Sequence, residues 1–278
     1  MIFSSFDFLF RFLPLFLILY FICPEKWRNQ CLFAGSLIFY FYGARHSPLY
    51  FVLFLLSIPV NFFIGQLIGR KRDAKERSFW LNAGIFYNLF WLILFKYSTF
   101  ITENLNLLLS YTKTGLQFPV IRLSLPLGIS FYTFQAMSYV IDLYRRRIEP
   151  QKNWFLLALY ISFFPQLVAG PIVRYTDVEA QLRSRTVTAQ GFSFGVKRFL
   201  YGLAKKVILA NCFAAKADEV FALDPAGVGT ALAWLGALYY GLQIYYDFSG
   251  YSDMAIGLGA MFGFTFPENF GYPYLSAS

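Results

Sequence analysis

The chain has 278 residues, of which 58% are hydrophobic, 22% aromatic and only 14% charged, and its formal net charge is +9. Soluble domains carry about 25% charged residues, and a mean hydropathy of +0.51 leaves more apolar surface than a core of this size can bury. The composition therefore excludes a water-soluble globular protein and indicates that lipid surrounds much of the chain.

The basic residues are grouped along the chain. Residues 70–206 hold 19 Lys and Arg against 7 Asp and Glu, whereas the residues after 206 hold one base against 6 acids. The bases lie in short stretches between apolar runs, which is the positive-inside pattern of membrane proteins. We therefore expect membrane lipid as a partner, and no nucleic acid.

Apolar stretches that can cross a bilayer recur from the first residues onward. The opening stretch lacks a basic n-region and a small-residue cleavage site, so we expect a retained first span instead of a removed signal peptide. Several later stretches are short, and the last two are separated by Gly250, so some of about seven to nine membrane helices should be tilted, broken or re-entrant. The candidate segments are 3–22, 31–43, 48–69, 79–101, 119–141, 153–173, 194–215, 231–248 and 251–266.

Two short basic loops predict the orientation of these helices. The loop at 70–77 holds five Lys or Arg and the loop at 145–152 holds four, so both should be cytoplasmic and the N-terminus extracytoplasmic. Helix breaks are expected where Pro and Gly interrupt apolar sequence, at 125–128 and 169–171. We see one all-α membrane domain over residues 1–278, a multispan helical bundle.

Motifs for metal or nucleotide chemistry are missing from the sequence. His46 is the only histidine, which excludes a metal site of two or three histidines, and a lone loop histidine is more often a locally bonded side chain than a base. The cysteines lack paired spacing, and neither a P-loop nor a GxGxxG sequence occurs. Close helix packing is expected at three GxxxG pairs, Gly65/Gly69, Gly191/Gly195 and Gly259/Gly263.

The segment 243–253 places carboxylates, hydroxyls and tyrosines inside apolar sequence. Ionisable groups at membrane depth usually face a cavity or a partner, although an interfacial turn with a tyrosine belt and capping aspartates would have the same composition. Asp247 and Asp253 would point to different faces of a continuous helix, unless Gly250 breaks it. A weaker polar cluster precedes Asp142, which could simply pair with Arg145 or Arg146.

Five segments together resemble the membrane-bound O-acyltransferases. The resemblance is closest to the bacterial branch that O-acetylates cell-surface polysaccharides such as alginate, and it runs along essentially the whole chain. The segments are FSSFDFLFRFLPLFLILYF near the N-terminus, LPLGISFYTFQAMSYVIDLYR (125–145), FFPQLVAGPIVR (163–174), FLYGLAKKVILAN (199–211) and YYDFSGYSDMAIGLGAMFGFTFPENFGYPYLSAS (245–278).

The resemblance implies a helical membrane bundle around a central cavity. It implies transfer of an acetyl group from acetyl-CoA or another cytoplasmic acyl thioester, with no permanently bound cofactor, to an exported polysaccharide, together with an extracytoplasmic O-acetyltransferase partner. Carried over residue by residue, it makes eight positions candidates to line the cavity: Tyr132, Gln135, Tyr246, Asp247, Ser249, Tyr251, Ser252 and Asp253. On the donor side it indicates Arg174, Lys205 and Lys206, which ordinary positive-inside charge explains equally well.

The family histidine that deprotonates the acceptor has no counterpart in this sequence. Relatives carry it after the segment that matches Pro273–Ser276, so the resemblance places it beyond Ser278 and assigns no catalytic residue or metal here. The chain is therefore expected to be the N-terminal portion of such an enzyme and inactive alone. Two alternatives remain, a scaffold subunit of a polysaccharide secretion complex and a transporter, although the internal repeat typical of transporters is not evident.

Overall fold

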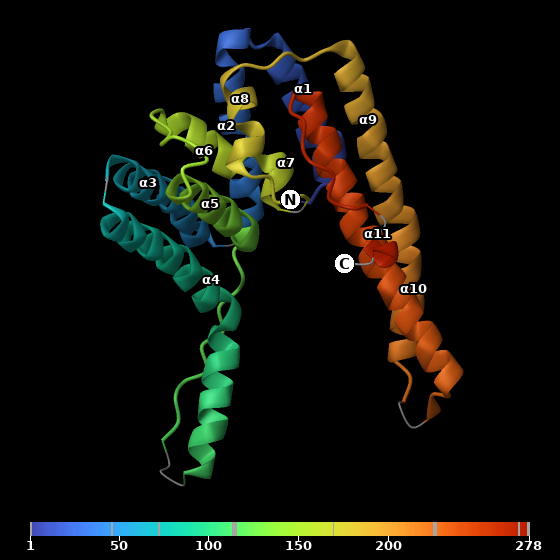
Figure 1. Ribbon diagram of the computed structural model, residues 1–278. Helices are drawn as coiled ribbons and strands as arrows, with labels where there is room; N and C mark the ends of the chain where they lie inside the picture. The colour runs from blue at the N-terminus through green and yellow to red at the C-terminus, as the bar shows by residue number, and fades with distance from the viewer. Residues whose placement is uncertain are drawn as a thin grey trace. The chain divides into compact units, whose positions relative to one another are not determined.

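The computed structural model describes residues 2–45, 47–71, 73–112, 116–168, 170–224, 227–271 and 273–276 (Figure 1). Every regular element in these ranges is helical, which confirms the all-α prediction. His46 and Ala169 lie outside the described residues. The chain divides into two compact units: the first comprises Met1–Gly35, Phe163–Val173 and Asp177–Ser278, and the second comprises Ser36–Ser162 and Arg174–Thr176.

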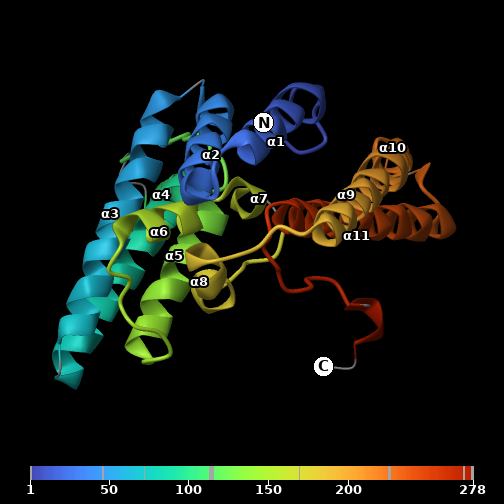
Figure 2. The ribbon, with the colours of Figure 1, turned by 90° about the horizontal axis from the view of Figure 1, so that it is seen from above.

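The second unit is a bundle in which α3, α4 and α5 pack against one another (Figures 1 and 2). Within the described part of the chain, α3 and α4 are the two helices long and apolar enough to cross a membrane. The side chain of Asp73 begins α4 by accepting a hydrogen bond from the Glu76 N–H at 3.4 Å, as an N-cap residue does. The helices of this unit are the end of α2 (Arg28–Ala44), α3 (Pro48–Arg70), α4 (Ala74–Tyr111), α5 (Ile129–Tyr144) and α6 (Trp154–Ser162).

The prediction of a helix over 119–141 is wrong at its first ten residues. The helix α5 begins only at Ile129, directly after Gly128, whose φ of +67° is left-handed. Pro119 and Pro126 lack the N–H that a helix interior needs, and hydropathy does not distinguish an apolar extended segment from an apolar helix. The predicted break at 125–128 is confirmed.

One end of the second unit brings the two predicted basic loops together. Buried Arg77, at the start of α4, donates hydrogen bonds from Nη2 to the carbonyls of Leu143 (3.1 Å) and Tyr144 (2.6 Å), the last residues of α5. A cation at the C-terminal end of a helix is favourable because the last carbonyl groups accept no hydrogen bond within the helix. Gln66 near the end of α3 also donates to the carbonyl of Gln151 at 2.7 Å. The loops 70–77 and 145–152 therefore lie at the same end.

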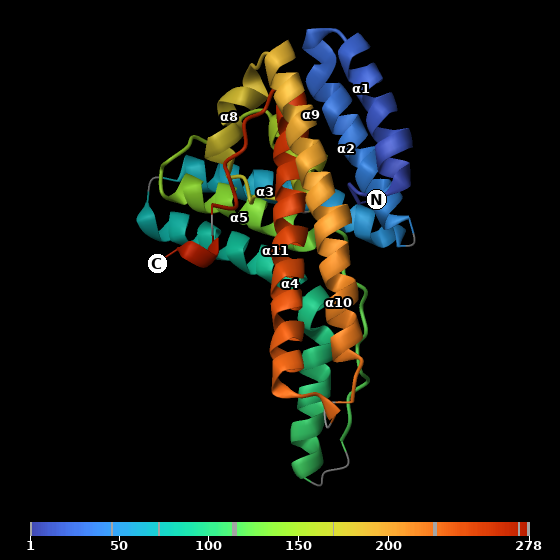
Figure 3. The same ribbon diagram turned by 90° about the vertical axis from the view of Figure 1, so that its right-hand side faces the viewer.

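The first unit is built around a long antiparallel helix pair, α9 and α11 (Figure 3). Thr188 begins α9 by accepting a hydrogen bond from the Gly191 N–H at 3.0 Å. A π-helical segment, η3, then joins α9 to α10 without a break. The elements of this unit are η1 (Asp7–Phe12), α1 (Leu13–Ile22), η2 (Glu25–Trp27), the start of α2, α7 (Phe164–Leu167), most of α8 (Tyr175–Arg183), α9 (Ala189–Ala204), η3 (Lys205–Ala210), α10 (Asn211–Phe221), α11 (Thr230–Met261) and η5 (Pro273–Leu275).

Glycines let α9 and α11 approach closely. A Cβ added to Gly250 would lie 2.7 Å from the Gly202 carbonyl oxygen, and one added to Gly195 would lie 2.6 Å from the Gly257 carbonyl oxygen. The two contacts are seven residues apart on each helix, and of these four glycines only Gly195 belongs to a predicted GxxxG pair. The prediction that Gly250 separates two segments is wrong, because this glycine is a packing position inside one continuous helix.

The predicted break at 169–171 is confirmed. The helix α7 ends at Leu167, and Gly170 has a φ of +114°, which L side chains rarely adopt. A Cβ on Gly170 would lie 2.6 Å from the Cβ of Ala255 on α11, so the broken segment packs against that helix. Two motifs singled out in the sequence, 163–174 and 245–278, therefore meet within one unit.

Candidate functional site

An ion cluster joins α9, η3 and α11 near the middle of their contact. Asp253 is buried, with 8% of its side chain exposed, and accepts from Arg198 Nε at 2.8 Å and from Lys205 Nζ at 2.6 Å. Arg198 also donates from Nη2 to Glu268 at 2.6 Å. Because removing a carboxylate from water is costly, Asp253 is stable here only through these two cations.

Lys206 forms a second and separate ion pair. Its ammonium pairs with Asp247, and it also lies 5.7 Å from the ring centroid of Tyr251, one turn further along α11. Tyr246 stacks on Phe213 of α10, with ring centroids 5.8 Å apart. Asp247 and Asp253 thus lie on one continuous helix and face different partners, as their six-residue spacing predicted.

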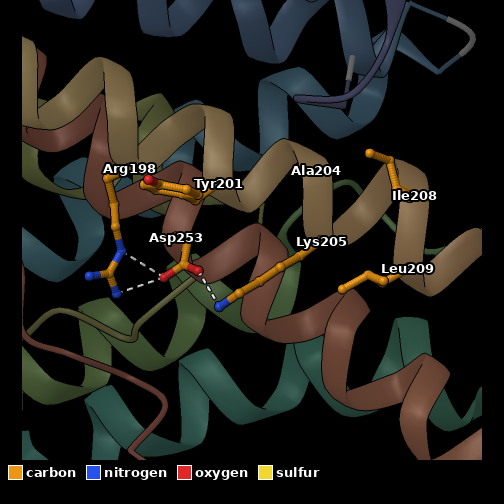
Figure 4. A pocket seen from close by; sticks show the side chains of 7 residues that line it. All are labelled: Arg198, Tyr201, Ala204, Lys205, Ile208, Leu209 and Asp253. Atoms are coloured by element: carbon orange, nitrogen blue, oxygen red, sulfur yellow. Dashed lines mark hydrogen bonds and ion pairs between the residues drawn. The ribbon is translucent and has the colours of Figure 1, made fainter.

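A cavity of about 580 Å³ opens beside the first ion cluster. In Figure 4 the side chains of Arg198, Lys205 and Asp253 point toward one another at its edge. Tyr201, Ala204, Ile208 and Leu209 complete the lining with largely apolar surface. A site whose two cations are held by carboxylates and whose walls are largely apolar can orient an oxygen-rich group, and none of its lining residues is a histidine.

Sequence reasoning missed Arg198 and Glu268. Arg198 precedes Lys205 by seven residues, which is two helical turns and places both on one face. That spacing was a readable signal, since a second cation on the same face suggests a shared carboxylate. Glu268 follows the end of α11 in irregular chain, and nothing in the sequence indicates that it returns to α9.

Two predicted cavity residues, Ser249 and Ser252, are buried on α11. They are 1% and 2% exposed, and their hydroxyls have no hydrogen-bond partner among the described residues. Buried polar groups are usually satisfied. Neither serine lines the cavity beside Asp253, so both hydroxyls lie inside the packed part of α11.

The remaining predicted residues belong to the second unit. Tyr132 and Gln135 are buried in α5, and the Tyr132 ring contacts Phe54 with centroids 5.1 Å apart. Tyr132 lines a cavity of only about 20 Å³, which is room for about one water and not for a substrate. Arg174 is exposed.

Asp142 is buried at the end of α5, and the expectation that it pairs with Arg145 or Arg146 is wrong. Its partner is Arg147, 3.6 Å away. The chain turns back after α5 so that the Arg147 N–H also donates to the Asp142 carbonyl at 3.0 Å.

Part of the chain matches a known protein family by sequence. Residues 152–275 match the model of the MBOAT, membrane-bound O-acyltransferase family, and this range contains the ion cluster, the broken segment and all of α11. Over these residues the chain is similar to the membrane-bound O-acyltransferases.

Individual relatives narrow the resemblance further. The chain is 44% identical to the probable alginate O-acetylase AlgI of Pseudomonas aeruginosa over an alignment that covers 100% of the chain and 52% of the relative. It is 33% identical to the peptidoglycan O-acetyltransferase of Helicobacter pylori, over 99% of the chain and 56% of the relative. A teichoic acid D-alanyltransferase of Bacillus subtilis is 27% identical over 54% of the chain and 38% of the relative. The chain thus spans about half the length of the first two relatives.

Proposed function

We propose that this chain is part of a membrane O-acetyltransferase that transfers an acetyl group to an exported cell-surface polysaccharide. The observation that carries the proposal is 44% identity to a probable alginate O-acetylase, sustained over the entire chain. The donor is acetyl-CoA or another acyl thioester on the cytoplasmic side. The acceptor is a polysaccharide such as alginate, and an extracytoplasmic O-acetyltransferase is the partner to which the acetyl group passes.

The protein is proposed to lie in the bacterial inner membrane as a multispan bundle with its N-terminus outside. Helices α3 and α4 are the spans best supported by length and composition. Because 70–77 and 145–152 share one end of the second unit, the positive-inside rule gives that end to the cytoplasm. This orientation sends α4 outward and returns the chain through α5.

Within this function, the residues around Asp253 hold and orient a substrate. Asp253 holds the side chains of Arg198 and Lys205 in place beside the cavity through its two hydrogen bonds. The proton transfer from the acceptor hydroxyl requires a general base such as a histidine, and no histidine is among these residues.

A replacement experiment in Pseudomonas aeruginosa tests the proposal. The matched half of the AlgI relative is exchanged for this chain, and the hybrid is expressed in an alginate-producing strain that lacks the native gene. The complete reading frame that encodes this chain is expressed in parallel. Ester-linked acetyl groups are then measured in the exported alginate. We expect either version to restore acetylation, whereas non-acetylated alginate from cells whose membranes contain both proteins contradicts the proposal.

Peptidoglycan is a second acceptor supported by a specific observation, the 33% identity to the Helicobacter pylori enzyme over 99% of the chain. Base-labile acetyl groups on purified peptidoglycan from the same strains distinguish the two acceptors. Acetyl groups on peptidoglycan alone would assign the chain to that branch.

A further inference from the structure

A second cavity of the first unit is basic and lies apart from the residues around Asp253. It has a volume of about 270 Å³ and is formed by the turn between α1 and α2 together with the stretch between α8 and α9. The lining residues are Tyr20, Glu25, Lys26, Arg28, Asn29, Arg183, Ser184 and Arg185.

Hydrogen bonds hold the two walls of this cavity together. Asn29 Nδ2 donates to the Leu182 carbonyl at 2.8 Å, and Arg185 Nη1 donates to Asn29 Oδ1 at 2.7 Å. Arg185 Nε also donates to the Phe262 carbonyl at 2.9 Å. The cavity is therefore formed before any ligand arrives, which reduces the entropic cost of binding.

Positive charge in the cavity exceeds negative charge. Arg28 bonds Glu25 at 3.2 Å, but 86% of that glutamate side chain is exposed, and Arg183 pairs with Glu179 at 2.9 Å. Neither Lys26 nor Arg185 has a carboxylate within ion-pair distance among the described residues. Burial lowers the pKa of Arg185, and the nearby charge of Arg28 adds to this effect. An anion in the cavity would relieve that repulsion.

The guanidinium of Arg28, which lines this cavity, has one N–H group that makes no hydrogen bond among the described residues. Its Nε is buried and has no hydrogen-bond partner in the part of the chain that the structure describes, although buried donors are normally satisfied. Arg28 is also the first residue of α2, a helix of 17 residues, and the N-terminal end of a helix favours an anion. A guanidinium presents parallel N–H groups whose spacing matches two oxygens of a phosphate.

We propose that the cavity lined by Lys26, Arg28, Arg183 and Arg185 is a binding site for a phosphate group. Two sources of phosphate fit the orientation proposed above, which puts the turn between α1 and α2 on the cytoplasmic side. One is a soluble nucleotide-type thioester donor, and the other is the headgroup of an anionic phospholipid in the inner leaflet. This inference rests on the proposed orientation, but not on acetyl transfer.

The test uses the full chain in lipid nanodiscs with two probes. Coenzyme A is titrated by calorimetry into protein held in phosphatidylcholine. Retention of phosphatidylglycerol from mixed phosphatidylcholine and phosphatidylglycerol nanodiscs is measured by native mass spectrometry. The variants are Arg28→Gln and Lys26→Gln, and Lys216→Gln is the matched control, because Lys216 is an exposed cation of the same unit paired only locally with Glu219.

The expected result is about a tenfold or greater loss in Arg28→Gln, a smaller loss in Lys26→Gln, and binding within about twofold of wild type in the control. A loss for coenzyme A identifies the soluble source, and a loss for phosphatidylglycerol identifies the lipid. If Arg28→Gln binds each probe as tightly as the wild type does, and the two proteins have the same unfolding midpoint, the proposed phosphate site is wrong. Arg28→Lys keeps the positive charge but lacks the parallel N–H groups of the guanidinium, so this variant should bind both probes with intermediate affinity.

Failure of this test is separable from failure of the proposed function. Neither binding readout involves acetyl transfer. If acetylation is observed without phosphate binding, only the proposed phosphate site is wrong. If phosphate binding is observed without acetylation, only the proposed enzymatic function is wrong.

Discussion

Asn61 of α3 and Asn88 of α4 hold each other through two amide hydrogen bonds. Asn88 Nδ2 donates to Asn61 Oδ1 at 2.7 Å, and Asn61 Nδ2 donates to Asn88 Oδ1 at 3.2 Å. Each amide also donates to a carbonyl four residues earlier in its own helix, that of Ser57 or Gly84. Both side chains are buried, at 0% and 4% exposed, so this pair satisfies itself where water is absent.

Replacing either asparagine leaves the other amide buried without its partner. Asn61→Leu and Asn88→Leu are each expected to lower the free energy of unfolding by about 1 kcal/mol, within the range for hydrogen bonds between membrane helices. The double variant should lose less than the sum, because it leaves no orphaned amide. Denaturation in mixed micelles measures the unfolding free energy of the wild type, the two single variants and the double variant. Asn104→Leu, at an exposed position of α4, is the control, and strictly additive losses would contradict the coupling.

Asp253 should matter far more than the other carboxylate that binds Arg198. Asp253→Asn leaves Arg198 and Lys205 facing each other without the buried anion, and we expect a loss of about 3 kcal/mol in unfolding free energy. Glu268→Gln removes the partner that is 59% exposed and should cost less than about 1 kcal/mol.

The same two variants also test the role of the cavity. In the Pseudomonas aeruginosa replacement strain, Asp253→Asn should abolish acetylation of alginate and Glu268→Gln should retain most of it. Equal effects of both variants, on stability and on acetylation, would show that Asp253 is not the centre of this cluster.

The close approach of α9 and α11 predicts opposite outcomes for two glycines of one helix. Gly250→Ala forces the added methyl against the Gly202 carbonyl oxygen and is expected to destabilise the protein by about 2 kcal/mol. Gly241→Ala meets no atom within 4 Å and should stabilise α11 by up to about 1 kcal/mol, because alanine is the better helix former. Thermal unfolding monitored by circular dichroism compares the two. A stable Gly250→Ala protein would mean that the helices lie further apart.

Orientation is checked by labelling single cysteines in intact cells. With the native cysteines replaced, Cys at Lys75 and at Arg146 should resist a membrane-impermeant thiol reagent until the cells are opened. The two positions are expected to behave alike, because Arg77 binds the end of α5 directly. Cys at Thr112, beyond the outward course of α4, is the positive control. Labelling of either basic loop from outside would reverse the proposed topology.

Much of the helical framework was readable from local sequence. The predicted segment 48–69 is nearly identical to α3 (Pro48–Arg70), because a long apolar run starting at Pro has few alternatives. Breaks at 125–128 and 169–171 were readable for a related reason, since Pro and Gly change the backbone directly. Gly250 could not be interpreted in this way, because a glycine can either break a helix or let another helix approach. Which of the two occurs depends on the packing partner, here α9.

Only part of the candidate site could be predicted from the sequence. The composition of 243–253 identified Asp247, Asp253, Ser249 and Ser252 as unusual in apolar sequence. The pairing of Lys205 with Asp253 and of Lys206 with Asp247 depends on the register between η3 and α11, and the first pair is 48 residues apart in the chain. That register is set by the glycine contacts, which local patterns do not encode.

The π-helical segment η3 has a consequence for comparing this chain with its relatives. A π-turn is one residue longer than an α-turn, and one residue of an α-helix corresponds to a rotation of about 100°. The extra residue within Lys205–Ala210 therefore sets which side of α10 meets α11, including the stacking of Phe213 on Tyr246. A one-residue alignment gap at this position, easily dismissed as noise between homologous sequences, would correspond to a helix turned by more than a quarter of a circle.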